Sequence, residues 1–561
     1  MIGSRRKGSI NYRHIGRYSE IASVMVKYGF GDLLSRLNIE RYLSATSRIF
    51  RSKKKRLTGI SRWDRIRMAL EELGPTFIKL GQFASNRPDV LPAELVASLE
   101  KLQDAVPPFP DIEARTLIEE ELGKPLDSLF KKFQLSPFAS ASMAQVHRAQ
   151  LHDGTTVAVK VQRPGISEMI STDLEIMYHI AHLIVKHIHS WEAFNPVQLV
   201  DEFAGALRKE LDFNTEALHF DHFRKNFQGD PSVFVPAVYH EFTTRKVLTT
   251  EYVEGIKISN VSQLISAGMN PKEIAGRGAQ IVLKQIFDHG FFHADPHPGN
   301  ILILNGNVIC LLDLGMTGIL TPTSRAQLSS IVIGVANRDP QRIVRTLYEI
   351  SGQQFRRGEE LEYEVAEMIQ EYASRALGTI NVGEVLNKLS QILVEHKLRL
   401  IPGFYLLVKA LVTMEGIGYK LDPHFNMMEY LEPFARKMIF EQYSPRHLAQ
   451  EAFQTSQDFL HLLRDFPSDT RDILQLVKMG KFRMEFEVRG LDPMLKKLDQ
   501  VINRLVFGIV LAALVIGSSI VVLSNLPPRF YGISVIGLGG YLAAGIMGFW
   551  LLISILHHER M

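Results

Sequence analysis

The residues best suited to chemistry lie together near the middle of the chain. Asp295 and Asn300 are separated by four residues, and Asp313 follows after two short apolar runs. In phosphoryl transfer, this spacing lets one carboxylate handle the proton of the nucleophile while an amide and a second carboxylate hold Mg²⁺. A polar surface loop before an ordinary hairpin is the alternative. The two motifs in this order favour a nucleotide site, with Asp295 catalytic and Asn300 and Asp313 as metal ligands.

The two apolar runs must position these residues. Residues 301–304 and 308–312 each have the length of a short strand, and Asn305-Gly306 between them predicts a type I′ turn. We therefore expect a β-hairpin with Asn300 at its start and Asp313 at its end.

An upstream lysine is placed to bind phosphate. Residues 157–161, V-A-V-K-V, predict a strand that carries Lys160, although a surface lysine at a strand end is the alternative. The preceding loop has small side chains, and in kinases a loop at this place covers the phosphates with backbone N–H groups. Alanine adopts positive φ only at a cost, so this loop should be stiffer than a glycine-rich one. The residues expected to bind nucleotide here are Ala139, Ser140, Ala141, Ser142, Met143, Ala144 and Lys160.

A helix rich in acidic residues should supply the partner of Lys160. Glu216 is the predicted partner and thereby a member of the catalytic set, while Glu210 and Asp212 form a further acidic pair. For Asp212 alone, a solvated charge run on a helix remains an open alternative.

A second contact with nucleotide is expected at a hinge. Glu251, Tyr252 and Val253 follow two short apolar runs and precede a glycine. This pattern is typical of the kinase hinge, where backbone groups meet the adenine.

The composition limits the compartment and the partners. The chain has 561 residues, a net charge of +4 and a single cysteine, Cys310, so no disulfide can form within it and a reducing compartment is expected. Residues 1–67 carry 17 Lys and Arg against 4 Asp and Glu. We interpret this excess as attraction to an anionic membrane surface, because no nucleic-acid-binding motif accompanies it. A solvated tail explains residues 1–14 about as well.

Further motifs give a specific resemblance. The segment Lys79-Leu80-Gly81-Gln82 has a KxGQ pattern, residues 139–144 form an alanine-rich loop, and Glu210-Leu211-Asp212 has an ExD pattern. With Lys160 and the motifs at residues 295–313, the chain resembles the UbiB/AarF family of atypical kinases, the ADCK group of eukaryotes. One departure is Leu314, where many kinases have Phe.

The resemblance implies an α+β, protein-kinase-like fold of two lobes. It places the KxGQ helix over the site, with Lys79 and Gln82 where a peptide substrate would otherwise dock. It also implies that Lys79, Gln82, Glu210 and Asp212 contribute to nucleotide binding. It further implies ATP and Mg²⁺ as cofactors, kinase or ATPase activity, and a role in ubiquinone or other isoprenoid-lipid metabolism. The expected partners are a membrane lipid or prenylated small molecule and lipid-biosynthesis proteins, without nucleic acid. The alternative is a nucleotide-binding pseudokinase scaffold; an ordinary protein kinase is disfavoured by the KxGQ segment and the alanine-rich loop.

The C-terminal region predicts a membrane anchor. Residues 505–523 and 531–556 are two stretches without charge, of 19 and 26 residues, and about 20 suffice to cross a bilayer. Lysine and arginine residues flank this pair on its outer sides, with one Arg529 between the stretches, which places both ends and the catalytic region in the cytoplasm. We expect an integral membrane protein with a transmembrane helical hairpin.

These features predict a domain order. Residues 1–107 form a basic helical extension, 108–440 a kinase-like domain with lobes at about 111–255 and 256–440, 441–504 an amphipathic connector, and 505–556 the hairpin. Apolar spacing predicts helices in residues 16–50, and a helix from residue 63 that Gly74-Pro75 splits and Gly81 ends. Alternating apolar residues at 482–488 predict either a short strand or a membrane-facing edge. The helices expected in the second lobe and its additions cover residues 325–336, 339–351, 361–376 and 385–400.

Overall fold

The computed structural model separates the chain into two compact units. Unit 1 is Met1–Gln450 and unit 2 is Glu451–Met561. The structure describes residues 15–36, 59–85, 91–102, 107–187, 195–351, 359–373, 382–396, 398, 403–442, 478, 491–524, 527–530 and 533–558. The strand or membrane-facing edge expected at 482–488 and most of the expected connector lie outside these residues.

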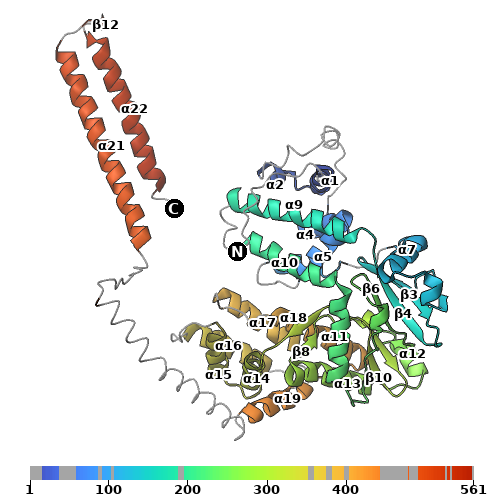
Figure 1. The fold of residues 1–561 in the computed structure, drawn as a ribbon. Coiled ribbons are helices and arrows are strands. Elements are labelled where there is room, and N and C mark those ends of the chain that lie inside the picture. Colours follow the sequence, from blue (N-terminus) through green and yellow to red (C-terminus); the bar gives the residue numbers. More distant parts are fainter. Residues whose placement is uncertain are drawn as a thin grey trace. The chain divides into compact units, whose positions relative to one another are not determined.

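A five-stranded antiparallel sheet forms the first lobe of unit 1 (Figure 1). Valines 157, 159 and 161 alternate along one strand and are fully buried against a helix, so the intervening Lys160 points to the opposite face of the sheet. The strands are β1 (Lys132–Phe133), β2 (Ala139–Ser140), β3 (Ala144–Gln150), β4 (Thr156–Gln162) and β6 (Val247–Glu251). The covering helices are α7 (Asp111–Leu122) and α8 (Leu126–Leu129).

The second lobe contains the predicted hairpin. Its sheet has the order β5-β10-β9-β7, and a separate pair joins β8 to β11. The predicted type I′ turn is wrong by one residue: Leu304 pairs with Val308 across a three-residue loop, in which Gly306 and Asn307 have φ of 77° and 61°. The strands are β5 (Val233–Phe234), β7 (Ile256–Lys257), β8 (Phe291–His293), β9 (Ile301–Leu304), β10 (Val308–Leu311) and β11 (Thr317–Ile319).

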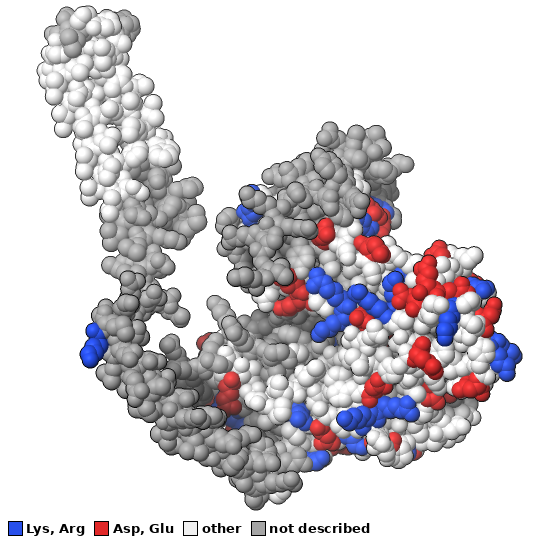
Figure 2. Space-filling view, viewed as in Figure 1, with Lys and Arg blue, Asp and Glu red and all other residues white. Residues whose placement is uncertain are grey.

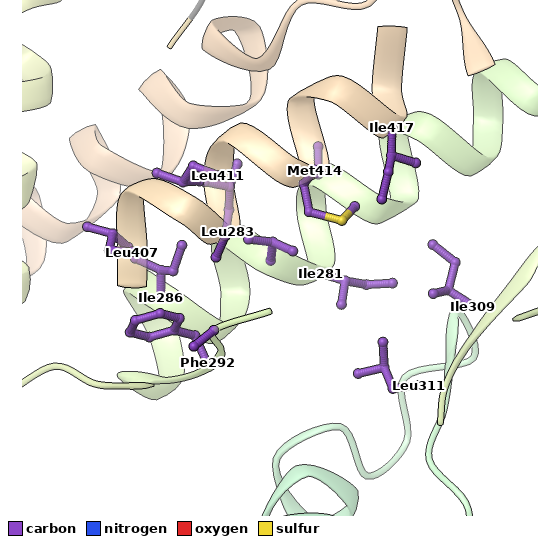
Figure 3. Packing of buried hydrophobic residues seen from close by; sticks show 14 of the residues in the cluster. Ile281, Leu283, Ile286, Phe292, Ile309, Leu311, Leu407, Leu411, Met414 and Ile417 are labelled. Atoms are coloured by element: carbon purple, nitrogen blue, oxygen red, sulfur yellow. The ribbon is translucent and has the colours of Figure 1, made fainter. Parts of the chain in front are cut away.

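Helices pack around this sheet and form the largest core of unit 1. Figure 3 shows side chains of α18 facing those of α13, β8 and β10. The predicted helices of this region are confirmed, with ends shifted by a few residues. The helices are α12 (Val261–Ser266), α13 (Pro271–Leu283), α14 (Pro322–Ala336), α15 (Pro340–Ser351), α16 (Glu359–Ala373), α17 (Val382–Glu395), α18 (Phe404–Leu421) and α19 (Met427–Gln442).

The N-terminal extension packs on helices that lie in the chain between β4 and β6 of the first sheet. Gly74, with φ of 93°, separates α4 from α5 as predicted, but the predicted break at Gly81 is wrong because α5 continues to Ser85. A Cβ at Gly81 would lie 2.2 Å from Leu102 Cδ1, so this glycine makes room for a neighbouring segment. The helices of this region are α1 (Ile15–Lys27), α2 (Gly31–Arg36), α4 (Arg62–Leu73), α5 (Pro75–Ser85), α6 (Ala93–Leu99), α9 (Ile166–His187), α10 (Pro196–Glu210) and α11 (Phe213–Asn226).

The described part of unit 2 contains a helical hairpin. Helices α21 (Leu491–Leu523) and α22 (Val535–His558) pack closely, since a Cβ at Gly540 would lie 2.1 Å from Ser518 Oγ. Their described surface carries exposed apolar side chains and shows no charge in the view of Figure 2.

One segment of this hairpin fits a membrane span. By length and composition, Leu505–Leu523 is the one helical segment among the described residues that is long and apolar enough to cross a membrane. The second span expected over 531–556 is not confirmed, because residues 533–534 form a strand and the apolar stretch Val535–Trp550 is shorter.

Candidate active site

An ion cluster of three side chains forms the centre of the site. Lys160 Nζ lies 2.9 and 2.8 Å from the two carboxylate oxygens of Glu216, and 3.4 Å from Asp313 Oδ2. Glu216 belongs to the first turn of α11 and is buried, whereas Asp313 follows β10. The predicted pairing of Lys160 with Glu216 is confirmed. The structure also brings the predicted metal carboxylate to the same ammonium group.

The two carboxylates of this cluster have pKa values shifted in opposite directions. Burial opposes the charge of Lys160, but Asp313 and Glu216 outweigh it and raise the pKa of Lys160 above its ordinary value. Burial also opposes the charge of Asp313, but Lys160 and the Gly315 N–H, which donates to Oδ1 at 2.9 Å, lower its pKa to about 2. Burial and the negative charge of Asp313 raise the pKa of Glu216 to about 7, although Lys160 acts in the opposite direction. Asp313 therefore retains its negative charge more firmly than Glu216 does.

The hairpin brings Asn300 and Asp313 together. The short helical turn η7 (Pro298–Asn300) leads into β9, and the Leu312 N–H donates to the Asn300 carbonyl at 2.9 Å. His297 caps this turn by accepting from the Gly299 N–H at 3.1 Å. Because Leu312 precedes Asp313 in the chain, this backbone bond holds the amide residue next to the carboxylate residue.

Asp295 meets a lysine that sequence reasoning missed. Lys409 Nζ lies 3.2 Å from Asp295 Oδ2, and the two side chains are 30% and 40% exposed. Lys409 comes from α18, far downstream in the chain, and no local pattern around Asp295 indicates it. The second missed residue is His293 on β8, whose buried Nε2 has no hydrogen-bond partner among the described residues. Burial lowers the pKa of His293, which favours its neutral form.

The KxGQ helix reaches the same cluster. Lys79 Nζ lies 2.5 Å from Glu210 Oε1 at the end of α10, and the positive charge of Lys79 contributes to the low pKa of Asp313. Gln82 lies three residues further along α5 and is half-buried. Asp212 caps α11, where its Oδ1 accepts from the Asn214 N–H at 3.1 Å. The ExD pattern therefore supplies the partner of Lys79, through Glu210, and the N-terminal cap of a helix, through Asp212. Nucleotide contacts of Lys79, Gln82, Glu210 and Asp212 stay predictions.

The alanine-rich loop is a tight turn that pairs with strand β3 and shares an apolar cluster with the helices α4 and α5. The Ala141 N–H donates to the Ala144 carbonyl at 2.8 Å, and Ala139 and Ser140 form strand β2, which pairs with β3. Ser142 and Met143 are buried, and Met143 packs in one apolar cluster with residues of α4 and α5. The N-terminal extension therefore packs against this loop, and the stiffness expected from its alanines stays a prediction.

At the predicted hinge, two of the three backbone N–H groups are already used. The Glu251 N–H donates to the Ala237 carbonyl at 2.8 Å, and the Tyr252 N–H donates to the Thr156 carbonyl at 3.2 Å. Among these three residues, the Val253 N–H is therefore the candidate donor to an adenine. The Tyr252 ring packs below the Arg148 guanidinium at 4.3 Å, at the outer end of the hinge.

The donor set suits a magnesium ion that arrives with phosphate. The described residues contain no group of three or more His, Cys, Asp or Glu side chains that could enclose a metal ion. Mg²⁺ needs no such cage, because it binds through one or two carboxylates, water and substrate phosphates. Asp313, whose side chain is 40% exposed, and Asn300 offer a carboxylate and an amide oxygen at one place. These residues therefore fit Mg²⁺ bound together with a nucleotide.

Comparison with known proteins identifies the family. Residues 101–347 match the ABC1 atypical kinase-like domain, 365–426 the UbiB helical domain, and 489–557 the ABC1/UbiB kinase-like C-terminal domain. The chain is 32% identical to an uncharacterized protein in the hydrogenase 1 5′ region of Clostridium pasteurianum, over 96% of this chain and 98% of that protein. It is 35% identical to the probable protein kinase UbiB of Marinobacter nauticus, over 75% and 78% of the two chains. It is 36% identical to the chloroplastic protein ACTIVITY OF BC1 COMPLEX KINASE 7 of Arabidopsis thaliana, over 74% and 60%. The chain therefore belongs to the ABC1/UbiB family of atypical kinase-like proteins.

Proposed function

We propose that the protein is a membrane-anchored atypical kinase or ATPase that binds Mg-ATP and supports ubiquinone or other isoprenoid-lipid metabolism. The observation that carries this proposal is the cluster of Lys160, Glu216 and Asp313, with distances of 2.8 to 3.4 Å to the lysine ammonium. In phosphoryl transfer such a lysine binds phosphate and such an aspartate binds the metal ion. Catalysis requires both the lysine–glutamate ion pair and the metal-binding aspartate.

The other residues have roles that follow from their positions. Lys160, held by Glu216, would position the phosphates. Asn300 and Asp313 would hold Mg²⁺, which would supply positive charge against the negative charge of the phosphates. Asp295 would orient the nucleophile, either water or a substrate hydroxyl, and accept its proton. The alanine-rich loop would cover the phosphates with its backbone.

The membrane part of the proposal rests on composition and on the hairpin. The segment Leu505–Leu523 has the length of a bilayer span, and the basic residues 1–67 suit an anionic lipid surface. The positive charges that flank the hairpin in sequence support a cytoplasmic side for the catalytic unit. A catalytic unit held at a membrane favours a lipid or prenylated small molecule as its substrate, with lipid-biosynthesis proteins as partners.

The test is ATP hydrolysis by the full chain in neutral and in anionic lipid vesicles. We expect Mg²⁺-dependent turnover that increases with anionic lipid and disappears in Asp313→Asn, because the metal carboxylate is lost. Asp127→Asn is the matched control, since its side chain is 91% exposed and lies outside the cluster. Tight nucleotide binding without turnover in any lipid would contradict the enzyme and indicate the pseudokinase scaffold.

A further inference from the structure

Helix α18 packs in the main core with one face and carries Lys409 on the opposite face. Leu407, Leu411 and Met414 recur at four- and three-residue steps, are buried, and pack in the main core (Figure 3). Lys409 lies two residues after Leu407, which is about 200° around the helix axis. The helix is therefore held by one face while Lys409 projects from the other. Phe292 packs in the same core and lies three residues before Asp295, so one packed unit supports both ends of the Lys409–Asp295 pair.

The Asp295 carboxylate has a single side-chain partner in the part of the chain that the structure describes. Among the described residues, Lys409 is the one side chain that hydrogen-bonds or forms an ion pair with the Asp295 carboxylate. The loop of Asp295 is held by its backbone, since the Ala294 N–H donates to the Met316 carbonyl at 3.0 Å. Backbone bonds fix the position of the residue but leave the direction of its carboxylate open. Lys409 supplies the contact that fixes this direction.

Stability alone does not explain this ion pair. Both side chains are about a third exposed, and pairs of this kind contribute little to folding because water screens them. The carboxylate concerned is the group expected to meet the nucleophile, and catalysis by such a group depends on its orientation. The benefit of the pair is therefore expected in the reaction rather than in the fold.

We propose that Lys409 is the positioning residue for Asp295, and that α18, the helix that ends the UbiB helical segment, serves to bring this ammonium group into the active site. The inference rests on the proposed phosphotransferase or ATPase function and deepens it. Lys409 lies beside the candidate base, while Lys160 and Lys79 lie beside the candidate metal carboxylate and Glu210. The three lysines thus have separate tasks, and Lys409 acts on the nucleophile side.

The experiment compares full-length variants in anionic lipid vesicles. Lys409→Met removes the charge, Lys409→Arg keeps it, and Lys420→Met on the exposed end of the same helix is the matched control. We measure kcat for Mg-ATP turnover, the Kd of Mg-ATP and the thermal unfolding midpoint. Lys409→Met should lower kcat by about 10²-fold, the loss typical of a preorganised active-site group. Its Kd should change less than about threefold, and Lys409→Arg should recover part of kcat.

Non-additivity provides the decisive comparison. If Lys409 acts through Asp295, Asp295→Asn combined with Lys409→Met should be no slower than Asp295→Asn alone. Losses that multiply in the double variant, an unchanged kcat, or an increased kcat in Lys409→Met would each overturn the inference. A parallel loss of kcat and unfolding midpoint in both Lys409 variants would also overturn it, because it would indicate a structural role. Absence of turnover in the wild-type protein would instead refute the proposed function, and this inference with it.

Discussion

Arg17 offers a test of how the N-terminal extension is attached. Its guanidinium donates to Asp173 through Nε at 2.8 Å and Nη2 at 3.0 Å, and Nη2 also donates to the Leu73 carbonyl at 2.7 Å. The side chain of Asp173 is 0% exposed, and that of Arg17 is 18% exposed. Arg17→Met removes the charge but retains an apolar side chain near the Phe77 ring, whose centroid lies 5.6 Å from the guanidinium carbon of Arg17. Asp173 is then left as a buried carboxylate without its cation.

The size of the effect follows from this burial. Removing one partner of a buried ion pair costs about 3–5 kcal/mol, because the other charge stays desolvated. The lost bond to Leu73 adds about 1 kcal/mol, and the retained apolar side chain offsets part of the total. We therefore expect α1 and the end of α4 to be destabilised by about 3 kcal/mol, which is about 10²-fold in their opening equilibrium. Arg67→Met is the control, since its partner Glu71, one turn along the same helix, is 37% exposed and stays hydrated when the arginine is lost, and such a pair contributes about 0.5 kcal/mol.

Native-state hydrogen exchange measures this effect locally. A local method is needed because a chain with two compact units does not unfold in one step. Amides of α1 and α4 should lose about 10²-fold protection in Arg17→Met and little in Arg67→Met. Combining Arg17→Met with Asp173→Leu should restore most of the protection, since neither charge is then buried alone. Equal protection in the two arginine variants, or no recovery in the double variant, would refute the reasoning.

Two further predictions concern stability in the kinase-like domain. Burial opposes the charge of Asp230, but hydrogen bonds from Lys284 and Ser232 lower its pKa to about 2. Asp230→Asn should therefore reduce the free energy of unfolding of this region by up to about 2 kcal/mol at pH 7. Because the folded pKa lies below the unfolded value of about 3.9, this difference should persist above pH 4 and decline as the pH falls towards 2, as measured by native-state hydrogen exchange of the amides around Asp230 and Lys284 at pH 7, 4 and 3. Gly318→Ala should cost about 1–3 kcal/mol, because its Cβ would lie 2.2 Å from Cζ of the buried Phe292 ring. Gly205→Ala in α10 is the control, with open space around its Cβ and an expected gain of up to about 1 kcal/mol; equal unfolding midpoints for the two variants would contradict this.

Local patterns were sufficient for the parts of the site that are close in sequence or built on regular elements. The alternation of valines along β4 buries one face of the strand and turns Lys160 to the other. Two apolar runs with a turn between them predicted β9 and β10, and therefore the proximity of Asn300 and Asp313. The pairing of Glu216 with Lys160 could be predicted because the acidic helix offers few candidates for one strand lysine.

Contacts between distant segments explain what the sequence did not reveal. The loop after β9 is three residues long because Asn307, at positive φ, accepts from the Asn270 N–H at 3.1 Å and donates to Glu273 at 2.8 Å. Gly81 continues its helix because a neighbouring segment, with Leu102, needs the space of a side chain. Lys409 has no local signature, since its partner Asp295 lies on another element that only the packing of α18 brings near. Each of these features depends on tertiary packing that periodicity does not encode.

The charges around the site share one arrangement. Each lysine belongs to a different element and is paired with a carboxylate from another element: Lys79 with Glu210, Lys160 with Glu216 and Asp313, and Lys409 with Asp295. A phosphate group that enters therefore meets ammonium groups whose charge is largely compensated, and it must compete with carboxylates already in place. A divalent cation at Asp313 would reduce this competition by adding positive charge where the carboxylates are most crowded. Under the proposed function, phosphate that draws Lys79 from Glu210 would also loosen the contact between α5 and α10, so nucleotide binding would be coupled to the packing of the N-terminal extension.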